Sequence, residues 1–321
     1  MQVYGLNHWG DSFLSCNLHR IEHYIKPYLG NVAVKDLTTH DLDLFYDSLQ
    51  DKPAVVLKGH KKTDACVSRS VIEKTHALLR SALNQAVIWE YIPSNPALRV
   101  TLPKYQPQER TVWSTSEAQT ALDACTDPVL KLCMLLALGC SMRVGEMLGL
   151  TWDCIDFATG IISVEKQMQL HQEKGSKGYE LVSPKNGRSR TIAAAQTVLA
   201  RLQQQRRWQM QQKLLLGSDW QNPEGLVFTN EFGTHLTKPT VYREYKRIVA
   251  AIGCPNARFH DLRHSYAVAA IRAGDDIKTV QGNLGHATAA FTLDVYGHVT
   301  DQMKRESADR MERFIRTVSA G

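Results

Sequence analysis

The chain has 321 residues, of which 43% are hydrophobic and 22% are charged, and its formal net charge is +6. This composition excludes a disordered or fibrous protein and is typical of a globular chain long enough for two domains, each with its own core. The mild positive charge favours a polyanionic partner, but by itself it excludes no class of function.

The sequence carries no pattern typical of a membrane segment, an export signal or a metal site. The most apolar run, residues 129–140, contains Lys131 and is far shorter than the roughly 20 apolar residues that cross a bilayer. The first residues, MQVYGLNHWGD, lack the pattern of a secretion signal. The seven cysteines are scattered without a C-x-x-C pair, which favours neither a disulfide framework nor a zinc site. We therefore expect a cytoplasmic protein.

Two helices are predicted before residue 93. Thr38 precedes Asp41 at the spacing of a capping box, in which the two residues satisfy backbone N–H groups at the start of a helix. The apolar residues on one face of this helix are Leu42, Phe45 and Leu49. A second, longer helix is predicted by another apolar face, which consists of Ile72, Leu79, Leu83 and Ala86. These patterns predict a small helical domain.

A proline-rich stretch follows this helical region, with prolines at Pro93, Pro96, Pro103 and Pro107. Proline denies a helix its backbone donor, so the stretch is typical of a linker between domains. We place the linker from about residue 93 and the boundary near residue 108. This boundary predicts one domain over residues 1–108 and a second over residues 109–321.

The second predicted domain is mainly helical with a small antiparallel sheet. Ser114 and Glu117 form a second capping-box pattern, and the apolar run from Val129 reads as a buried helix. Strand-like runs follow in IISVEKQMQL and ELVSPKNGRSRTIAA, where Asn186–Gly187 is a hairpin turn signal. Helices return over residues 193–216, 238–251 and 260–273, and an amphipathic tail helix is predicted over residues 301–318 with Met311, Phe314, Ile315 and Val318 on one side.

Three segments of this second domain stand out by residue type and order. They are ALGCSMRVGEMLGLTWDCIDF, SPKNGRSR and RFHDLRHSYAVAAIRAGDDIKTVQGNLGHATAAFTLDVYGHV. Together they resemble the tyrosine recombinase and integrase family, in particular integrases of conjugative transposons and temperate phages. The first arginine motif of the family is matched by Gly139, Arg143, Glu146, Leu150 and Trp152. The histidine-x-x-arginine box, the L-G-H box, the hairpin lysine and the nucleophile are matched by His260 with Arg263, by Leu284 to His286, by Lys185 and by Tyr296.

The resemblance implies a helical core-binding domain followed by a mixed α/β catalytic domain, and it implies the role of each matched residue. Arg143 and Arg263 clamp the phosphate, because a guanidinium is a planar, permanently charged fork suited to phosphate oxygens. His260 and His286 add hydrogen bonds and handle protons. Tyr296 is the nucleophile, and the charged pocket activates its phenol. Lys185 protonates the departing 5′ oxygen, with Lys174 and Lys177 as rivals for this role.

No cofactor is implied by this chemistry. A phosphotyrosyl bond conserves the energy of the broken phosphodiester, so strand rejoining requires no ATP. The sequence has no phosphate-binding loop of the G-x-x-x-x-G-K-[ST] type and no carboxylate cluster typical of a metal-dependent nuclease. We expect Glu146 to orient and neutralise the site and not to bind a metal.

The expected partner is double-stranded DNA at attachment or core sites. The resemblance implies a homotetramer on DNA, a monomer in its absence and DNA-bending accessory proteins. Many relatives carry a further arm-binding domain at the amino end, and the residues before the helical domain here are too few for one, so we expect either a natural short form or a fragment of a longer protein. Basic side chains of the first domain either meet DNA phosphates or form a solvated face: Lys58, Lys61, Lys62, Arg69, Lys74 and Arg80. The tail helix either covers its own domain or docks on a neighbouring subunit.

The function expected from the resemblance is site-specific recombination that integrates or excises a mobile element. A chromosome-dimer resolvase or a type IB topoisomerase shares the chemistry and differs in its task. A different class, a non-catalytic helix-turn-helix regulator, fits the stretch DDIKTVQGNLGHATAAFTLDVY superficially. That alternative leaves Arg143, Lys185 and His260 without a shared purpose.

Overall fold

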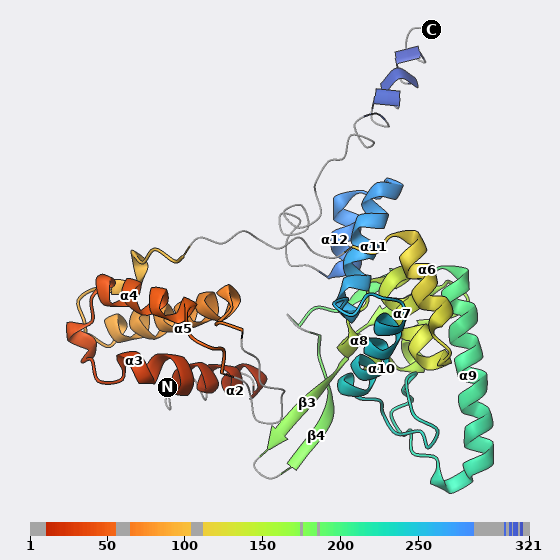
Figure 1. Ribbon diagram of the computed structural model, residues 1–321. Helices are drawn as coiled ribbons and strands as arrows, with labels where there is room; N and C mark the ends of the chain where they lie inside the picture. The colour runs from red at the N-terminus through yellow and green to blue at the C-terminus, as the bar shows by residue number, and fades with distance from the viewer. Residues whose placement is uncertain are drawn as a thin grey trace. The chain divides into compact units, whose positions relative to one another are not determined.

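The computed structural model describes residues 11–55, 65–103, 112–173, 176–184 and 187–285, together with residues 305, 308–309, 311–313, 315 and 316. The chain divides into two compact units, Met1–Gln108 and Glu109–Gly321 (Figure 1). Among the described residues, no helix is both long enough and apolar enough to span a membrane.

The first unit is helical. Its elements are α2 (Asp11–Arg20), a π-helical turn (Ile21–Ile25), α3 (Lys26–Leu29), α4 (Thr39–Gln50) and α5 (Arg69–Ile88), with short 3₁₀ helices at Val34–Asp36 and Pro96–Leu98. The predicted capping box begins α4, because the Asp41 N–H donates to Thr38 Oγ1 and the Thr38 N–H donates to Asp41 Oδ2. The predicted apolar faces of α4 and α5 meet in one core of buried side chains, which includes Leu42, Phe45, Leu49, Ile72, Leu79 and Leu83.

The second unit has seven α-helices over the described residues between 112 and 285. They are α6 (Thr115–Ala124), α7 (Pro128–Cys140), α8 (Val144–Leu148), α9 (Gln196–Leu216), α10 (Lys238–Ala251), α11 (Phe259–Ala273) and α12 (Ile277–Leu284). The capping box predicted for Ser114 and Glu117 begins α6. The predicted buried helix is α7, which packs against α9 and α11 and is apolar on nearly every side. It is the centre of the larger core.

Two antiparallel sheets, instead of one, accompany these helices. One has the strand order β1 (Ile155–Asp156), β2 (Ile161–Val164), β5 (Arg190–Ala193), and the other consists of β3 (Gln167–Glu173) and β4 (Ser176–Val182). Strands β3 and β4 pair in full register from Gln167 opposite Val182 to Glu173 opposite Ser176, and in Figure 1 they extend from the helices of this unit.

The hairpin predicted at Asn186–Gly187 is wrong. Strand β4 pairs with β3, while β5 pairs with β2, so the segment around Gly187 connects two sheets and not two paired strands. The physical reason is burial, because the pairing of β5 with β2 places Ile192 opposite Ile162 and both side chains belong to the core.

The fold class predicted from the sequence is confirmed as mainly helical with small antiparallel sheets. Parts of the predicted tail are helical, and Met311 and Ile315 each expose 52% of their surface. Phe314 and Val318 lie outside the described residues.

Candidate active site

The turn between α7 and α8 places the first arginine motif. Ser141 ends α7 in the left-handed region, with φ +52, and it is fully buried. This conformation is uncommon for a residue with a side chain and is retained where surrounding contacts determine it. Arg143 then adopts an extended backbone and precedes α8, where its N–H donates to Glu146 Oε2 over 2.9 Å.

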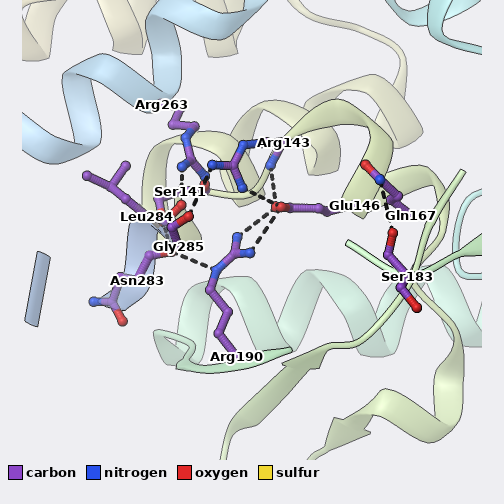
Figure 2. Close-up of polar contacts among 10 residues, drawn as sticks. All are labelled: Ser141, Arg143, Glu146, Gln167, Ser183, Arg190, Arg263, Asn283, Leu284 and Gly285. Atoms are coloured by element: carbon purple, nitrogen blue, oxygen red, sulfur yellow. Dashed lines mark hydrogen bonds and ion pairs between the residues drawn. The ribbon is translucent and has the colours of Figure 1, made fainter. Parts of the chain in front are cut away.

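The Glu146 carboxylate lies between two guanidinium groups (Figure 2). Arg143 Nη1 donates to Oε1 over 2.6 Å, and Arg190 donates from Nη1 to Oε1 over 3.0 Å and from Nη2 to Oε2 over 2.7 Å. Burial alone raises the pKa of this carboxyl. The hydrogen bonds and charge of Arg190, followed by the charge of Arg143, outweigh burial and lower the pKa of Glu146 to about 2. Glu146 is therefore a carboxylate that neutralises part of the positive charge of the site.

The carboxyl end of α12 is the point on which three arginines converge. Arg263 donates to the carbonyl oxygens of Ser141 and Leu284, and Arg143 Nη2 donates to the carbonyl of Gly285 over 3.4 Å. The carbonyl of Asn283 accepts hydrogen bonds from Arg190 Nε over 2.9 Å and from Ser141 Oγ over 2.7 Å. These donors satisfy carbonyl groups at the helix end, where positive charge is also favoured by the helix dipole.

Helix α11 carries both His260 and Arg263, which are three residues apart and therefore share a side of the helix. Burial of Phe259 and Leu262 in the large core anchors this end of α11. Partial burial of the ring, followed by the charges of Arg263 and Arg143, lowers the pKa of His260 to about 4. The His260 ring is therefore neutral at pH 7, and its centroid lies 4.8 Å from that of His264.

The structure brings together Arg143, Glu146, His260 and Arg263 from the predicted catalytic set. The remaining three predicted residues, Lys185, His286 and Tyr296, lie outside the described residues. His286 directly follows Gly285, whose carbonyl accepts the hydrogen bond from Arg143, so the arginine cluster lies immediately before this histidine in the chain.

The predicted DNA-contacting residues of the first unit differ in accessibility. Lys74 and Arg80 are exposed on α5, whereas the Arg69 side chain is only 19% exposed and pairs with Glu73 over 3.0 Å. Lys58, Lys61 and Lys62 lie outside the described residues. On accessibility, Lys74 and Arg80 are the better placed of the described residues to reach a phosphate.

Arg190 is the site residue that sequence reasoning missed. It begins β5, and its side chain is 10% exposed. A signal was present in the strand pattern, because residues i and i+2 lie on the same face of a strand and Ile192 is an apolar residue that joins the core. An arginine on a buried face requires an acidic partner. Within the segment SPKNGRSR, the sequence predicted a role in the site for Lys185 alone.

Comparison with known proteins gives matches over most of the chain. Residues 105–303 match the model of the Phage integrase family. A tyrosine recombinase XerC-like protein of Caldanaerobacter subterraneus subsp. tengcongensis is 31% identical over 259 residues, which cover 76% of this chain and 66% of that relative. This chain thus spans slightly less than two thirds of that relative's length. The ICEBs1 integrase of Bacillus subtilis is 22% identical over 318 residues, covering 96% of this chain and 78% of that protein.

Solved structures share the fold. The Tn1549 transposon integrase in complex with transposon right end DNA superposes with a TM-score of 0.77 at 18% identity, covering 97% of both chains. A lambda integrase tetramer bound to a Holliday junction superposes with a TM-score of 0.60 at 18% identity, covering 90% of this chain and 75% of that one. At this identity the likeness shows that this chain has the same fold as those integrases.

Proposed function

Because this chain belongs to the phage integrase family, we propose that it is a site-specific DNA recombinase. It cleaves and rejoins DNA strands through a covalent 3′-phosphotyrosyl intermediate, and it integrates or excises a mobile element. The relatives that support the mobile-element assignment include the ICEBs1 integrase and a putative prophage integrase of Mycobacterium tuberculosis.

The observation that carries this proposal is the convergence of Arg143 and Arg263 on one helix end. Their guanidinium groups reach the carbonyls of Gly285 and Leu284, although the two arginines belong to different helices. Two permanent positive charges beside the residue that precedes His286 form a site suited to an anionic phosphodiester and to the additional negative charge of its transition state. Arg143 keeps 29% of its side chain exposed, so it is open to a ligand from solvent.

The cleavage step uses this charge. The phenolic oxygen of Tyr296 attacks the scissile phosphorus, and the bond between phosphorus and the 5′ oxygen breaks. Lys185 transfers a proton to the departing 5′ oxygen, while Arg143, Arg263 and His286 stabilise the charge on the non-bridging oxygens. A 5′ hydroxyl from another strand then attacks the phosphotyrosyl bond and releases Tyr296. The reaction is balanced without ATP, a metal or an organic cofactor.

His260 enters this reaction as a neutral ring. Since its pKa is lowered to about 4, one ring nitrogen donates a hydrogen bond at pH 7 and the other accepts one. A neutral imidazole can hydrogen-bond a phosphate oxygen. With a pKa of about 4 it is too weak a base to hold the proton of the Tyr296 phenol, which passes to solvent water as the phenolic oxygen attacks. It adds no further positive charge beside Arg143 and Arg263.

DNA is held by both domains in this proposal. The first unit, over residues 1–108, is the core-binding domain, and the second, over residues 109–321, is the catalytic domain. Lys74 and Arg80 contact phosphates, which position the protein on DNA without reading its sequence. Four copies act together on two DNA sites, as in the lambda integrase tetramer bound to a Holliday junction. The protein works in the bacterial cytoplasm, at the nucleoid.

A non-catalytic helix-turn-helix regulator is disfavoured by the position of α12. The carbonyl groups at its carboxyl end are bound by three arginines, two of which also hold a buried carboxylate. Such a charged cluster has no role in presenting a recognition helix to a DNA groove.

Covalent trapping tests the proposal. The substrates are duplexes tiled across the DNA that flanks the gene, each with a nick close to the tested phosphate. After cleavage, the short fragment that carries the new 5′ hydroxyl is lost, so the strand cannot be rejoined. The wild-type protein should form a denaturant-resistant DNA adduct with one of these duplexes. Tyr296→Phe should bind the same duplex and form no adduct. Absence of an adduct with every duplex, or an equal adduct with Tyr296→Phe, contradicts the proposed function.

A further inference from the structure

Arg190 on β5 contacts two separate parts of the site. Its guanidinium forms a two-pronged pair with the Glu146 carboxylate, and its Nε donates to the carbonyl of Asn283 over 2.9 Å. Glu146 in turn holds Arg143 through Nη1 and through the backbone N–H. One side chain thus links β5, the start of α8 and the end of α12 (Figure 2).

Gly285 gives independent evidence that this contact is close. Gly285 has φ +59, and a Cβ atom placed on it would lie 3.1 Å from Arg190 Nη1, 3.2 Å from Cδ and 3.3 Å from Cζ. The Arg190 side chain therefore packs directly against the backbone of the residue that precedes His286. A side chain at position 285 would displace this arginine.

Arg190 is the principal side-chain partner of Glu146. Arg190 contributes two hydrogen bonds to the carboxylate, while the Arg143 side chain contributes one. The Glu146 side chain is 1% exposed, so water does not replace a lost partner. Without Arg190, the carboxylate depends on Arg143 alone and draws that guanidinium toward itself and away from a phosphate.

We propose that Arg190 is a positioning residue for the groups that bind the phosphate. It orients Arg143 through Glu146, and it orients the chain that leads into His286 through the backbone of Asn283–Gly285. This inference rests on the proposed recombinase function. Arg190 acts through other residues and does not itself contact the reacting phosphate.

The test separates clamp positioning from general support of the fold by changing the charge of the substrate. Replacing one non-bridging oxygen of the scissile phosphate by a methyl group makes the phosphate neutral, so the transition state depends less on Arg143 and His286. Single-turnover cleavage of the nicked duplex is measured with the phosphodiester and with this methylphosphonate. The variants are Arg190→Met, Arg190→Lys and, as a matched control, Arg201→Met, which removes an exposed arginine of α9 that pairs with Gln204.

The expected result is a loss that depends on the substrate. Arg190→Met should cleave the phosphodiester about 100-fold more slowly than wild type, because misplacement of a charge-stabilising donor has an effect of this size. On the methylphosphonate the difference should shrink to a few-fold. Arg190→Lys keeps the charge beside Glu146 without the fork, so its rate should lie between wild type and Arg190→Met. Binding of the uncleaved duplex should match wild type in all three variants.

If the ratio of the wild-type cleavage rate to the Arg190→Met cleavage rate is the same on both substrates, the inference is overturned, since a purely structural role lowers both rates alike. Full phosphodiester activity in Arg190→Met overturns it as well. If Arg190→Met fails to fold, the two rates of Arg190→Lys decide by the same criterion. Failure of the wild-type protein to form any adduct contradicts the recombinase function itself, so the two failures are distinguishable.

Discussion

Arg143 and Arg263 donate hydrogen bonds to the carbonyl oxygens of consecutive residues, Gly285 and Leu284, at the carboxyl end of α12. The two guanidinium groups come from the start of α8 and from the amino-terminal part of α11, and both reach the backbone that leads into His286. Each arginine therefore serves the local fold as well as the proposed phosphate site, and a conservative replacement should separate these two roles.

Arg143→Lys should lower single-turnover cleavage about 100-fold, because an ammonium group cannot replace a guanidinium that donates to Glu146 and to Gly285 at once. Cleavage of the trapped duplex and its binding are measured in parallel, with Arg201→Lys as the control. A cleavage rate within a factor of three of wild type would show that the fork of Arg143 is not required.

Glu146→Gln should make the free energy of unfolding less dependent on pH in the acidic range. The pKa of Glu146 is lowered from 4.5 to about 2, so between these values the unfolded chain binds a proton that the folded chain does not. The free energy of unfolding of the wild type therefore falls as the pH falls through this window, and the contribution is complete above pH 4.5. At pH 7 the variant should be less stable by about 3 kcal/mol, since it leaves two arginines without their carboxylate. Urea unfolding at pH 7, 4.5 and 3 should show this difference shrinking with pH; a constant difference contradicts the ion-pair account.

His260 should remain neutral throughout the physiological range. Its pKa is lowered from 6.5 to about 4 by partial burial and by the two neighbouring arginines. In spectra of protein with isotopically labelled histidine, the His260 resonance, assigned with His260→Gln, should not shift between pH 8 and about pH 5.5. A midpoint close to 6.5 would mean that the ring is solvated and lies outside the field of Arg143 and Arg263.

Gly285→Ala should be more harmful than Gly274→Ala, although both glycines have positive φ. Both substitutions carry the backbone cost of about 1–2 kcal/mol for a left-handed residue, and Gly274, with φ +101, carries at least as much of it as Gly285, with φ +59. Only at position 285 would the new Cβ crowd the Arg190 side chain, since nothing lies within 4 Å of a Cβ at position 274. Chemical unfolding and the cleavage rate of both variants provide the comparison. Equal effects would indicate that Arg190 moves aside freely.

Lys74 and Arg80 should each contribute one phosphate contact in the DNA complex. Replacing either by Gln should weaken binding to all duplexes alike and reduce the slope of log affinity against log salt concentration by about 0.9. Arg69→Gln, on the same helix, should leave the slope unchanged because Arg69 is paired with Glu73 and largely covered. A reduced slope for Arg69→Gln would mean that this arginine leaves Glu73 when DNA binds.

Local patterns in the sequence determined much of this protein. The capping boxes at Thr38 and Ser114 and the apolar faces of α4 and α5 involve residues within a few positions of one another, so spacing alone predicts them. The motifs around Arg143 and Arg263 identified the family, which the comparisons confirm, and predicted the two arginines that the structure brings to one helix end.

Only the tertiary structure decided the pairing of β5 with β2 and the place of Arg190 between Glu146 and Asn283. It also lowered the pKa of His260, buried most of the Arg69 side chain and left the Lys74 side chain exposed. The physical reason is the same in each case. Burial, strand pairing and the electric field at a side chain depend on residues that are distant along the chain, and no local spacing encodes which of them become neighbours.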